Sequence, residues 1–527
     1  MKPVIYQVLP RLFGNVNPSC IPGGSYADNG CGKLNDFTSK RLNAIRDMGV
    51  THIWYTGVLD HATQTSFPND GLPADEPSHV KGQAGSPYAI RDYYNIAPSL
   101  AVNVPDRLKE FDNLVRRTHR AGLKVIIDFV PNHVAHRYTG TTQPFTDENF
   151  YPGRLCDGDW TDTAKLNYGN RDTWMKMRDI LLFWAARHVD GFRCDMAELV
   201  PVEFWQWVIP QIKAQHPAIL FIAEVYQPWR YRDYIEQGHF DYLYDKVGLY
   251  DTLIRLLQGQ ESATAITHCW QSLGNLTPHM LHFLENHDER RLASDFICGD
   301  GRKALPALVV STCIDTCPFM VYFGQELGER GMEAEGFSGI DGKTTIFDYW
   351  SIPTLRQELT DDVAPRKDDK KENSSAGKAL SADPVSTTFV PTGSDKVFTN
   401  GDFLPYYYSR LLQLLNSEQA LSDGKFFDLM YVNPQSEHFN PHRQYAFLRH
   451  AGHDLLLVCA NFDDQPANVR IHIPEHAFDY LGLPIIVHAQ ATDLLTGQSI
   501  SCSLSSFCPV PISLQPRSAA ILKFVLP

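Results

Sequence analysis

The chain has 527 residues, of which 43% are hydrophobic and 20% charged, a composition typical of a soluble globular protein with roughly two to four domains. Its formal net charge of -14 argues against a nucleic acid or an anionic membrane as the main partner, because both bind basic surfaces. A neutral ligand agrees better with this charge, and an aromatic content of 12% is compatible with rings that stack on sugar faces.

The cysteines and the first residues indicate where the protein works. The 11 cysteines are scattered and include no C-x-x-C pair, and the opening segment MKPVIYQVLPRLF is not the apolar stretch of a secretory signal. No window of the sequence has enough consecutive apolar residues to span a membrane. We therefore expect free thiols and a cytoplasmic location, with no membrane partner.

Short apolar segments alternate with amphipathic helical patterns along most of the chain, as in a parallel α/β sheet. In residues 106–122, for example, apolar residues recur at spacings of three and four before Gly122, which predicts a helix and its end. The segments predicted to be strands are 4–8, 52–55, 124–128, 191–194, 220–223, 240–244, 280–284 and 319–323. Eight such units predict an α/β fold, a (β/α)8 TIM barrel.

Two segments interrupt this alternation. Residues 134–166 are polar and rich in turn-forming residues, and we expect them to form a short inserted domain after the third strand. Residues 358–402 include the run RKDDKKENSSAGKALSADP, which is typical of a flexible surface loop. The sequence leaves open whether this loop covers a cleft, binds a partner or only contacts solvent.

A second domain is predicted after the helix FLPYYYSRLLQLLNSEQAL. The segments YAFLRH, DLLLVCANF, NVRIHI and AAILKFVL are typical of antiparallel strands and predict a C-terminal β-sandwich. The predicted division is a catalytic barrel over 1–133 and 167–420, an inserted domain over 134–166 and a β-sandwich over 421–527.

The stretch GFRCDMAEL (191–199) places two opposite charges in an apolar run. Because strand side chains alternate in direction, Arg193 and Asp195 share one face, while Phe192 and Cys194 share the other. A structural ion pair would have the same pattern. In barrels of this kind, however, functional groups lie at the C-terminal ends of the strands, so the neighbouring strand ends must be considered as well.

Polar residues also follow the third, fifth and seventh predicted strands. Taken singly, Glu224 could be a loop cap, His133 a surface imidazole and Asp288 a helix N-cap. Asp195, Glu224 and Asp288 are nevertheless predicted to face one mouth of the barrel, where repulsion between carboxylates raises the pKa of one of them and suits it to acid catalysis.

The stretches DFVPNH, GFRCDMAEL, FIAEVY and ENHDE resemble, in the same order, the four conserved sequence regions of the α-amylase family of retaining glycoside hydrolases (family 13). YQVLPRLF, SPYAIRDYYNIAP and PFMVYFGQELG are similar to that family as well. The resemblance covers about residues 1–350, and the predicted C-terminal sandwich is also typical of the family.

This resemblance implies roles for individual residues. Asp195 resembles the nucleophile, Glu224 the general acid/base, and Asp288 the third acid, which holds sugar hydroxyls. Arg193 would orient the nucleophile and keep it ionised. The residues implied to contact the sugar are Tyr88, His133, Arg193 and His287. The implied chemistry is double displacement through a glycosyl-enzyme intermediate, which requires carboxyl groups about 5 Å apart.

The implied activity is hydrolysis of α-1,4-linked glucans or maltooligosaccharides, with no cofactor required for the chemistry. A glucanotransferase or a glucoside isomerase such as a trehalose synthase is the alternative, because transfer uses the same intermediate. A catalytically silent glycan-binding relative is a more distant alternative, and the presence of all three acids argues against it. Linkage preference and oligomeric state do not follow from the sequence.

A structural calcium ion is the one metal that the resemblance implies. Asn132 resembles a calcium-ligand position, and segment 134–166 contributes several acids. Glu198 and Leu199, however, stand where many α-amylases have a lysine for substrate and a histidine for calcium. The altered histidine position weakens the case for calcium.

Overall fold

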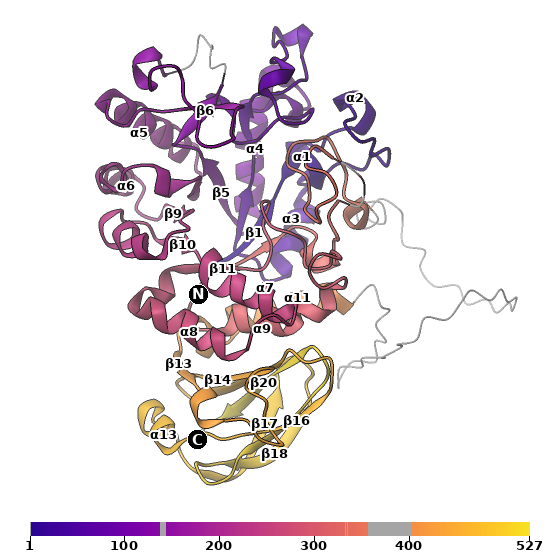
Figure 1. Ribbon diagram of the computed structural model, residues 1–527, viewed down its shortest axis with the longest axis vertical. Helices are drawn as coiled ribbons and strands as arrows, with labels where there is room; N and C mark the ends of the chain where they lie inside the picture. The colour runs from indigo at the N-terminus through magenta and orange to yellow at the C-terminus, as the bar shows by residue number, and fades with distance from the viewer. Residues whose placement is uncertain (1, 137–143, 333, 335, 357–402) are drawn as a thin grey trace, which may run out of the picture.

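The computed structural model describes residues 2–136, 144–332, 334, 336–356 and 403–527. Its first part is a closed barrel of eight parallel strands, hydrogen-bonded in the order β1-β12-β11-β10-β9-β8-β5-β2 (Figure 1). The strands are β1 (Val4–Val8), β2 (His52–Tyr55), β5 (Lys124–Phe129), β8 (Gly191–Cys194), β9 (Leu220–Ala223), β10 (Tyr242–Tyr244), β11 (Met280–Phe283) and β12 (Phe319–Tyr322). The predicted (β/α)8 barrel is therefore confirmed.

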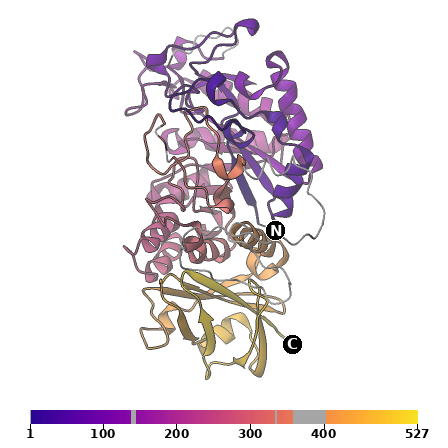
Figure 2. The same cartoon turned by 90° about the vertical axis from the view of Figure 1, so that its right-hand side faces the viewer.

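Helices cover the outside of the barrel, as Figure 2 shows for its N-terminal half. In α4 (Arg107–Arg120), the buried residues Phe111, Leu114 and Thr118 recur at the helical spacing, so one stripe of this helix packs inward. The other long helices are α3 (Ser39–Asp47), α5 (Arg171–Ala185), α6 (Val202–Gln215), α8 (Thr264–Leu273), α9 (Leu305–Cys313) and α11 (Phe403–Ser417). No helix among the described residues is both long and apolar enough to cross a membrane.

The barrel interior is filled by side chains from alternating strand positions. Ile5, Trp54, Ile126, Ile222 and Met320 belong to one buried cluster that also includes Tyr244, Leu281 and Phe283. Packed side chains fill the barrel, so the polar residues at the strand ends lie above a layer of buried side chains.

Two excursions leave the barrel, and the sequence predicted only one of them. After β5, strands β6 (His133–Ala135) and β7 (Thr163–Lys165) pair antiparallel within the predicted insertion. Between β2 and β5, strands β3 (Leu59–His61) and β4 (Ile90–Ile96) form a second antiparallel ribbon. The sequence analysis missed it because β3 is only three residues long, too short for a periodic pattern. The domain bounds stay a prediction, and the loop predicted over 358–402 lies outside the described residues.

The C-terminal part is an antiparallel two-sheet domain, as predicted. Its larger sheet has the order β13-β14-β15-β20-β17-β18, and β16 pairs with β19 in a smaller one. The strands are β13 (Lys425–Asp428), β14 (Gln444–Ala451), β15 (Asp454–Asn461), β16 (Ala467–Ile471), β17 (Ile486–Asp493), β18 (Ser499–Leu504), β19 (Val510–Leu514) and β20 (Ser518–Val525). Helix α13 (Glu475–Leu481) lies at the edge of this domain.

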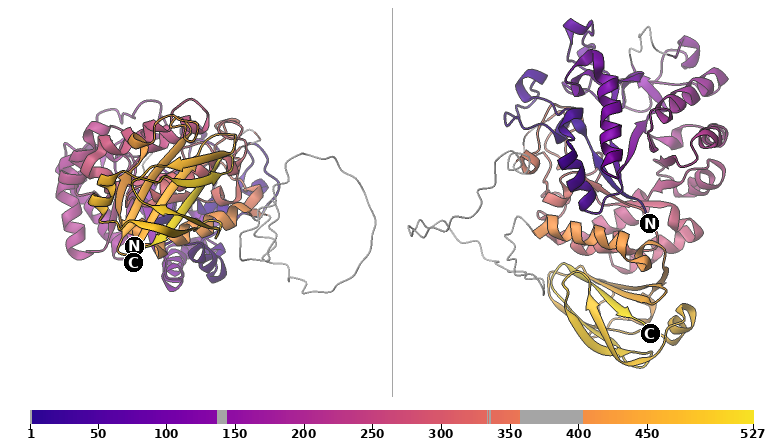
Figure 3. Two further views of the ribbon diagram at one scale, coloured as in Figure 1. Left: turned by 90° about the horizontal axis from the view of Figure 1, so that it is seen from below. Right: turned by 180° about the vertical axis from the view of Figure 1, so that it is seen from behind.

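Helix α11 connects the two domains. It is the orange helix above the yellow sheets in Figure 3. Arg410 Nε donates to the carbonyl oxygen of Leu494 at 2.9 Å, and Asn416 Nδ2 donates to that of Gly49 at 2.7 Å. These bonds attach the same helix to the C-terminal domain and to the barrel, so the two parts are joined by polar contacts as well as by packing.

Arg449 on β14 is a second attachment, and it is fully buried. Its Nε donates to the carbonyl oxygen of Ala420 at 2.9 Å, and its Nη2 donates to that of Gly424 at 3.0 Å. Asp315, in the loop before β12, lies 3.9 Å from Nη1. One guanidinium thus holds the segment around α12 (Gln419–Ser422) between barrel and sheet.

We expect Arg449→Met to lower the free energy of unfolding by about 3 kcal/mol, because buried carbonyl oxygens lose their donors. Urea titration followed by tryptophan fluorescence measures this change. Arg470→Met, at an exposed position of β16, is the matched control and should be nearly neutral. Equal midpoints for both variants would contradict the anchoring role of Arg449.

Candidate active site

The ends of β8 and β9 bring two acids side by side. Cys194 and Ala223 are paired in the parallel register, so Asp195 and Glu224 are the next residues on neighbouring strands. Asp195 is 6% exposed and Glu224 is 3% exposed. The closed barrel thus places two buried carboxylates, 29 positions apart in sequence, at the same mouth.

One guanidinium bridges these two acids. Arg193 is fully buried, and its Nη1 donates to Asp195 Oδ1 at 2.6 Å, while its Nη2 lies 2.7 Å from Glu224 Oε2. Arg193 Nε donates to the hydroxyl of Tyr244 at 3.2 Å, and Asp128 Oδ1 is 3.6 Å from Nη1. Three carboxylates therefore share one positive charge.

This excess of negative charge affects the protonation of the buried carboxyl groups. Burial raises the pKa of the Asp195 carboxyl well above its usual value, while the charge of Arg193 lowers it. Burial likewise raises the pKa of Asp128 to about 6, against the opposing charge of Arg193 and a hydrogen bond from the Gly57 amide. Arg193 is accordingly the group that favours the ionised forms of Asp195 and Asp128.

Glu224 has two further donors. The backbone N–H of Met196 donates to Oε2 at 2.8 Å, and the hydroxyl of Tyr226 donates to Oε1 at 2.5 Å. Burial, together with the charge of Glu224, raises the pKa of Tyr226 well above its usual range, so this hydroxyl stays a donor. Met196 has φ 42°, a strained conformation for a residue with a side chain. The strained backbone at Met196 thus directs its N–H towards Glu224.

Glu198, one of the two positions that depart from many α-amylases, binds the loop that carries Tyr226. Its Oε2 accepts hydrogen bonds from the backbone N–H groups of Tyr226 and Gln227 at 3.1 and 3.2 Å. Its carbonyl oxygen accepts one from Arg230 Nη1 at 2.6 Å. Glu198 therefore ties the end of β8 to the loop after β9, which carries Tyr226.

Tyr88, His287 and Asp288 form a second group. The Tyr88 hydroxyl is 2.5 Å from His287 Nε2, and Asp288 Oδ2 is 3.1 Å from the same nitrogen. Gln7 Nε2 lies 2.7 Å from His287 Nδ1. Since an amide nitrogen can only donate, Nδ1 accepts and the proton of the neutral ring is on Nε2, facing Tyr88 and Asp288. Burial and the charge of Arg193 lower the pKa of His287 well below its usual value, so the ring is neutral.

The two groups meet through the Tyr88 ring. Arg193 lies 5.2 Å from its centroid, and the Tyr88 hydroxyl donates to Asp128 Oδ1 at 3.5 Å. His133 approaches from the other side, with Nε2 4.0 Å from Asp195 Oδ2. Burial lowers the pKa of His133 to about 4, so it is also a neutral imidazole near neutral pH.

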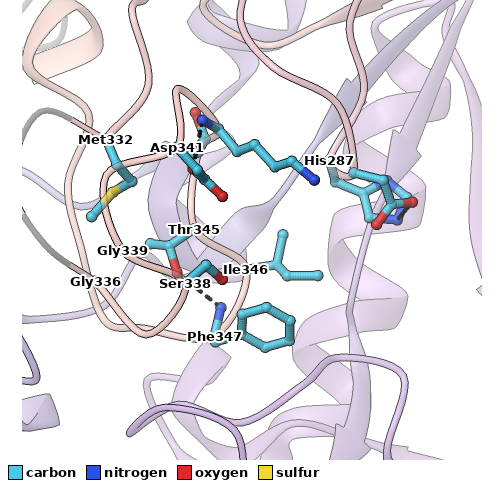
Figure 4. A pocket seen from close by; sticks show the side chains of 12 residues that line it. His287, Met332, Gly336, Ser338, Gly339, Asp341, Thr345, Ile346 and Phe347 are labelled. Carbon is cyan, nitrogen blue, oxygen red and sulfur yellow. Dashed lines mark hydrogen bonds and ion pairs between the residues drawn. The ribbon is translucent and has the colours of Figure 1, made fainter. Parts of the chain in front are cut away.

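The Asp288 side chain is 43% exposed and opens into a cavity of about 150 Å³ (Figure 4). Figure 4 shows His287 on one side of this cavity and Met332, Ser338 and Phe347, from the segment after β12, on the other. Its lining residues are His287, Asp288, Met332, Gly336, Ser338, Gly339, Asp341, Lys343, Thr344, Thr345, Ile346 and Phe347. The third acid is thus the one most open to a ligand.

The structure therefore brings together Tyr88, His133, Arg193, Asp195, Glu224, His287 and Asp288, and Asn132 Nδ2 lies 3.2 Å from His133 Nδ1. The sequence analysis did not single out Gln7 and Tyr226. Gln7 was detectable as the one polar residue in the apolar strand VIYQV, where it is fully buried. Tyr226 was detectable as well, because it stands two residues after Glu224 in FIAEVY, a spacing that places side chains on one face of an extended segment.

The surroundings of Asn132 do not fit a calcium ion. Asn132 Nδ2 donates to Asp157 Oδ2 at 2.7 Å, and Lys165 Nζ donates to Asp157 Oδ1 at 2.7 Å. Calcium requires six to eight oxygen ligands, whereas here an ammonium group already balances the carboxylate. Among the residues that the structure describes, no three His, Cys, Asp or Glu side chains gather as a metal site. The metal role suggested for Asn132 is therefore not supported by this geometry.

The family model of the alpha-amylase catalytic domain matches residues 7–160 and 146–424. The chain belongs to the α-amylase family. Members of this family are glycoside hydrolases or transferases. Alpha-amylase MalA of Haloarcula japonica is 28% identical over 56% of this chain and 42% of its own length. The intracellular maltogenic amylase of Bacillus subtilis is 23% identical over 62% of this chain and 56% of its own. The chain thus spans about half the length of these relatives.

Solved structures agree with the fold. The maltogenic α-amylase AmyB of Thermotoga neapolitana superposes with a TM-score of 0.65 at 20% identity, covering 100% of this chain and 99% of its own. The α-amylase of Geobacillus thermoleovorans in complex with acarbose has a TM-score of 0.67 at 17% identity, covering 99% and 98%. The α-amylase architecture therefore extends over both domains of this chain.

Because Lys165 supplies the positive charge beside Asp157, we expect the chelator EDTA to leave the unfolding temperature unchanged. Lys165→Met should lower that temperature, since Asp157 loses its charged partner, and differential scanning fluorimetry measures both effects. Lys40→Met, at an exposed position of α3, is a control for removal of a lysine charge. A fall in the unfolding temperature with EDTA, reversed by added calcium, would contradict this assignment.

Proposed function

We propose that the chain is a retaining hydrolase of α-glucosidic bonds, acting on α-1,4-linked glucans or maltooligosaccharides. The observation that carries this proposal is the buried Arg193 guanidinium between Asp195 and Glu224. Two carboxylates held close together at the mouth of a barrel are what double displacement with retention requires. Neutral imidazoles and a tyrosine ring around them suit an uncharged sugar.

In the first step, Asp195 acts as the nucleophile. Arg193 binds Oδ1 and keeps the carboxylate ionised, so Oδ2, on the side of His133, is the oxygen that attacks the anomeric carbon. The bond from Oδ2 to this carbon forms while the glycosidic bond breaks, and Glu224 donates its proton to the departing oxygen. The net negative charge of the acids stabilises the positive charge that develops on the sugar ring.

In the second step, Glu224 takes the proton of a water molecule that attacks the same carbon and releases Asp195. Asp195 is an ester at this stage, so the charge of Arg193 is shared by two carboxylates, Glu224 and Asp128. Asp288, on the open side, would hold hydroxyl groups of the sugar, with Nε2–H of His287 as a further donor. His133 would be a hydrogen-bond partner on the side of Asp195, and Tyr88 the ring beneath the sugar.

We also propose a cytoplasmic location. All 11 cysteines lie within the described residues, and each is a free thiol. Free thiols in this number are typical of a reducing compartment. One relative of similar sequence is described as an intracellular maltogenic amylase.

We expect Glu224→Gln to lower kcat on maltoheptaose by about 10²- to 10⁴-fold, because proton transfer is lost, and Asp195→Asn to lower it at least as much. Chromatography of the products measures these rates. Asp47→Asn, with a side chain that is 65% exposed on α3, is the matched control and should keep full activity. Turnover undiminished in Asp195→Asn would exclude the proposed nucleophile.

Retention predicts that each newly formed reducing end is first the α-anomer. Proton NMR of maltoheptaose turnover, recorded before mutarotation, distinguishes the two anomers. Initial release of the β-anomer would contradict double displacement. Products longer than the substrate would show instead that a sugar accepts the intermediate, which is the behaviour of a glucanotransferase.

A further inference from the structure

A groove lined by aromatic rings lies outside the barrel, between α8 and the C-terminal domain. It encloses about 430 Å³, a volume in the range of small-molecule binding sites. Its lining residues are Thr267, Trp270, Gln271, Phe426, Phe427, Asp428, Tyr431, His476 and Tyr480. Figure 1 shows α8, β13 and α13 along one side of the molecule, where these residues lie. None of the described residues lines both this groove and the cavity beside Asp288.

We propose that this groove is a second binding site for an α-glucan chain, separate from the catalytic centre. The inference rests on the proposed function, since it takes the polysaccharide on which the enzyme acts as the ligand. Its structural basis is the arrangement of the rings and a lining whose one acid, Asp428, is already hydrogen-bonded.

The rings are both exposed and close together. Tyr431 is 59% exposed and Tyr480 is 55% exposed. Phe427 lies between them, with centroid distances of 6.5 Å to Tyr431 and 6.0 Å to Tyr480. The Phe427 ring is tilted by 57° to Tyr431 and by 42° to Tyr480, so it does not stack on either of them. Neighbouring exposed rings of this kind mark interaction sites more often than chance.

The rings are also held in place before a ligand binds. The Tyr431 hydroxyl is hydrogen-bonded to His476. Lys425 Nζ lies 5.1 Å from the centroid of Tyr480, and Trp270 Nε1 donates to the hydroxyl of Tyr445 at 3.3 Å. A ligand that binds here therefore orders few side chains, which lowers the entropic cost of binding.

The chemistry of the groove favours a sugar over a peptide or a charged ligand. Its lining has six aromatic or imidazole rings and, among the described residues, no Leu, Ile, Val or Met, the side chains that anchor peptides. Asp428, the one acid in the lining, is already bonded through Oδ2 to the hydroxyls of Thr267 and Tyr445, both at 2.7 Å. Flat rings suit the C–H faces of glucose, and the exposed Gln271 amide can bond its hydroxyl groups.

A second site has a consequence that depends on substrate length. A long glucan that occupies both sites is bound more tightly than by either site alone, because the second contact is intramolecular. A maltooligosaccharide too short to reach both sites gains no affinity from the second one. The groove should therefore raise affinity for glycogen while leaving turnover of short substrates unchanged.

The test uses the full chain with Asp195→Asn, so that no ligand is consumed. Affinity electrophoresis in gels containing glycogen compares this protein with the same protein carrying Tyr431→Ala and Tyr480→Ala. We expect the dissociation constant for glycogen to rise about tenfold. Phe507→Ala removes a ring that is 81% exposed elsewhere in the C-terminal domain, and it should leave binding unchanged.

Gln271→Arg blocks the groove without removing a ring, so it covers the case in which the tyrosine variants fail to fold. In the active enzyme, Gln271→Arg should keep kcat/KM on maltotetraose and raise KM for glycogen.

If both sets of variants bind glycogen like the parent while the wild type turns over maltoheptaose, the second site is refuted and the proposed function stands. If the wild type neither binds nor cleaves glucans, both fail. Sedimentation that shows a dimer dissociated by the tyrosine variants, with glycogen binding intact, would make the groove a self-association surface and also overturn the proposal.

Discussion

A buried cation, Arg193, organises the mouth of this barrel. Its guanidinium has no exposed surface and lies within 2.7 Å of carboxylates from two different strands. Burying a charge costs several kcal/mol unless it is paired with good geometry, so the arginine and the two acids are stable in this place only as a set. The pairing fixes Asp195 relative to Glu224 before a ligand arrives. The relative position of the two carboxylates is therefore a property of the folded protein.

The residues around this set hold it from both sides. Met196 adopts a left-handed conformation that turns its N–H towards Glu224, and Glu198 binds the backbone of the loop that carries Tyr226. A lysine at position 198 could not accept these two N–H bonds. The glutamate at this position, which differs from many α-amylases, thus has a structural role. It connects the end of β8 to the loop after β9.

Other cations hold further parts of the structure together. Lys165 pairs with Asp157 within the inserted ribbon, and Arg449 binds backbone carbonyl oxygens where the C-terminal sheet meets the barrel. The second of these junctions has a further effect. Because β13 is held against α8, rings from both elements come together in one groove, which neither domain would form alone.

The sequence by itself determined the barrel, since each strand is a short apolar run flanked by helical patterns, and burial of such runs is a local property. It also determined which polar residues stand at the strand ends, because strand direction and alternation place them there. The tertiary structure decided their partners. Gln7 meets His287 across 280 positions, Lys165 takes the place beside Asp157, and β3 pairs with β4 through a ribbon without a periodic signal. Hydrogen-bond partners of this kind depend on register and loop path, which are set by packing of the whole chain and by no local pattern.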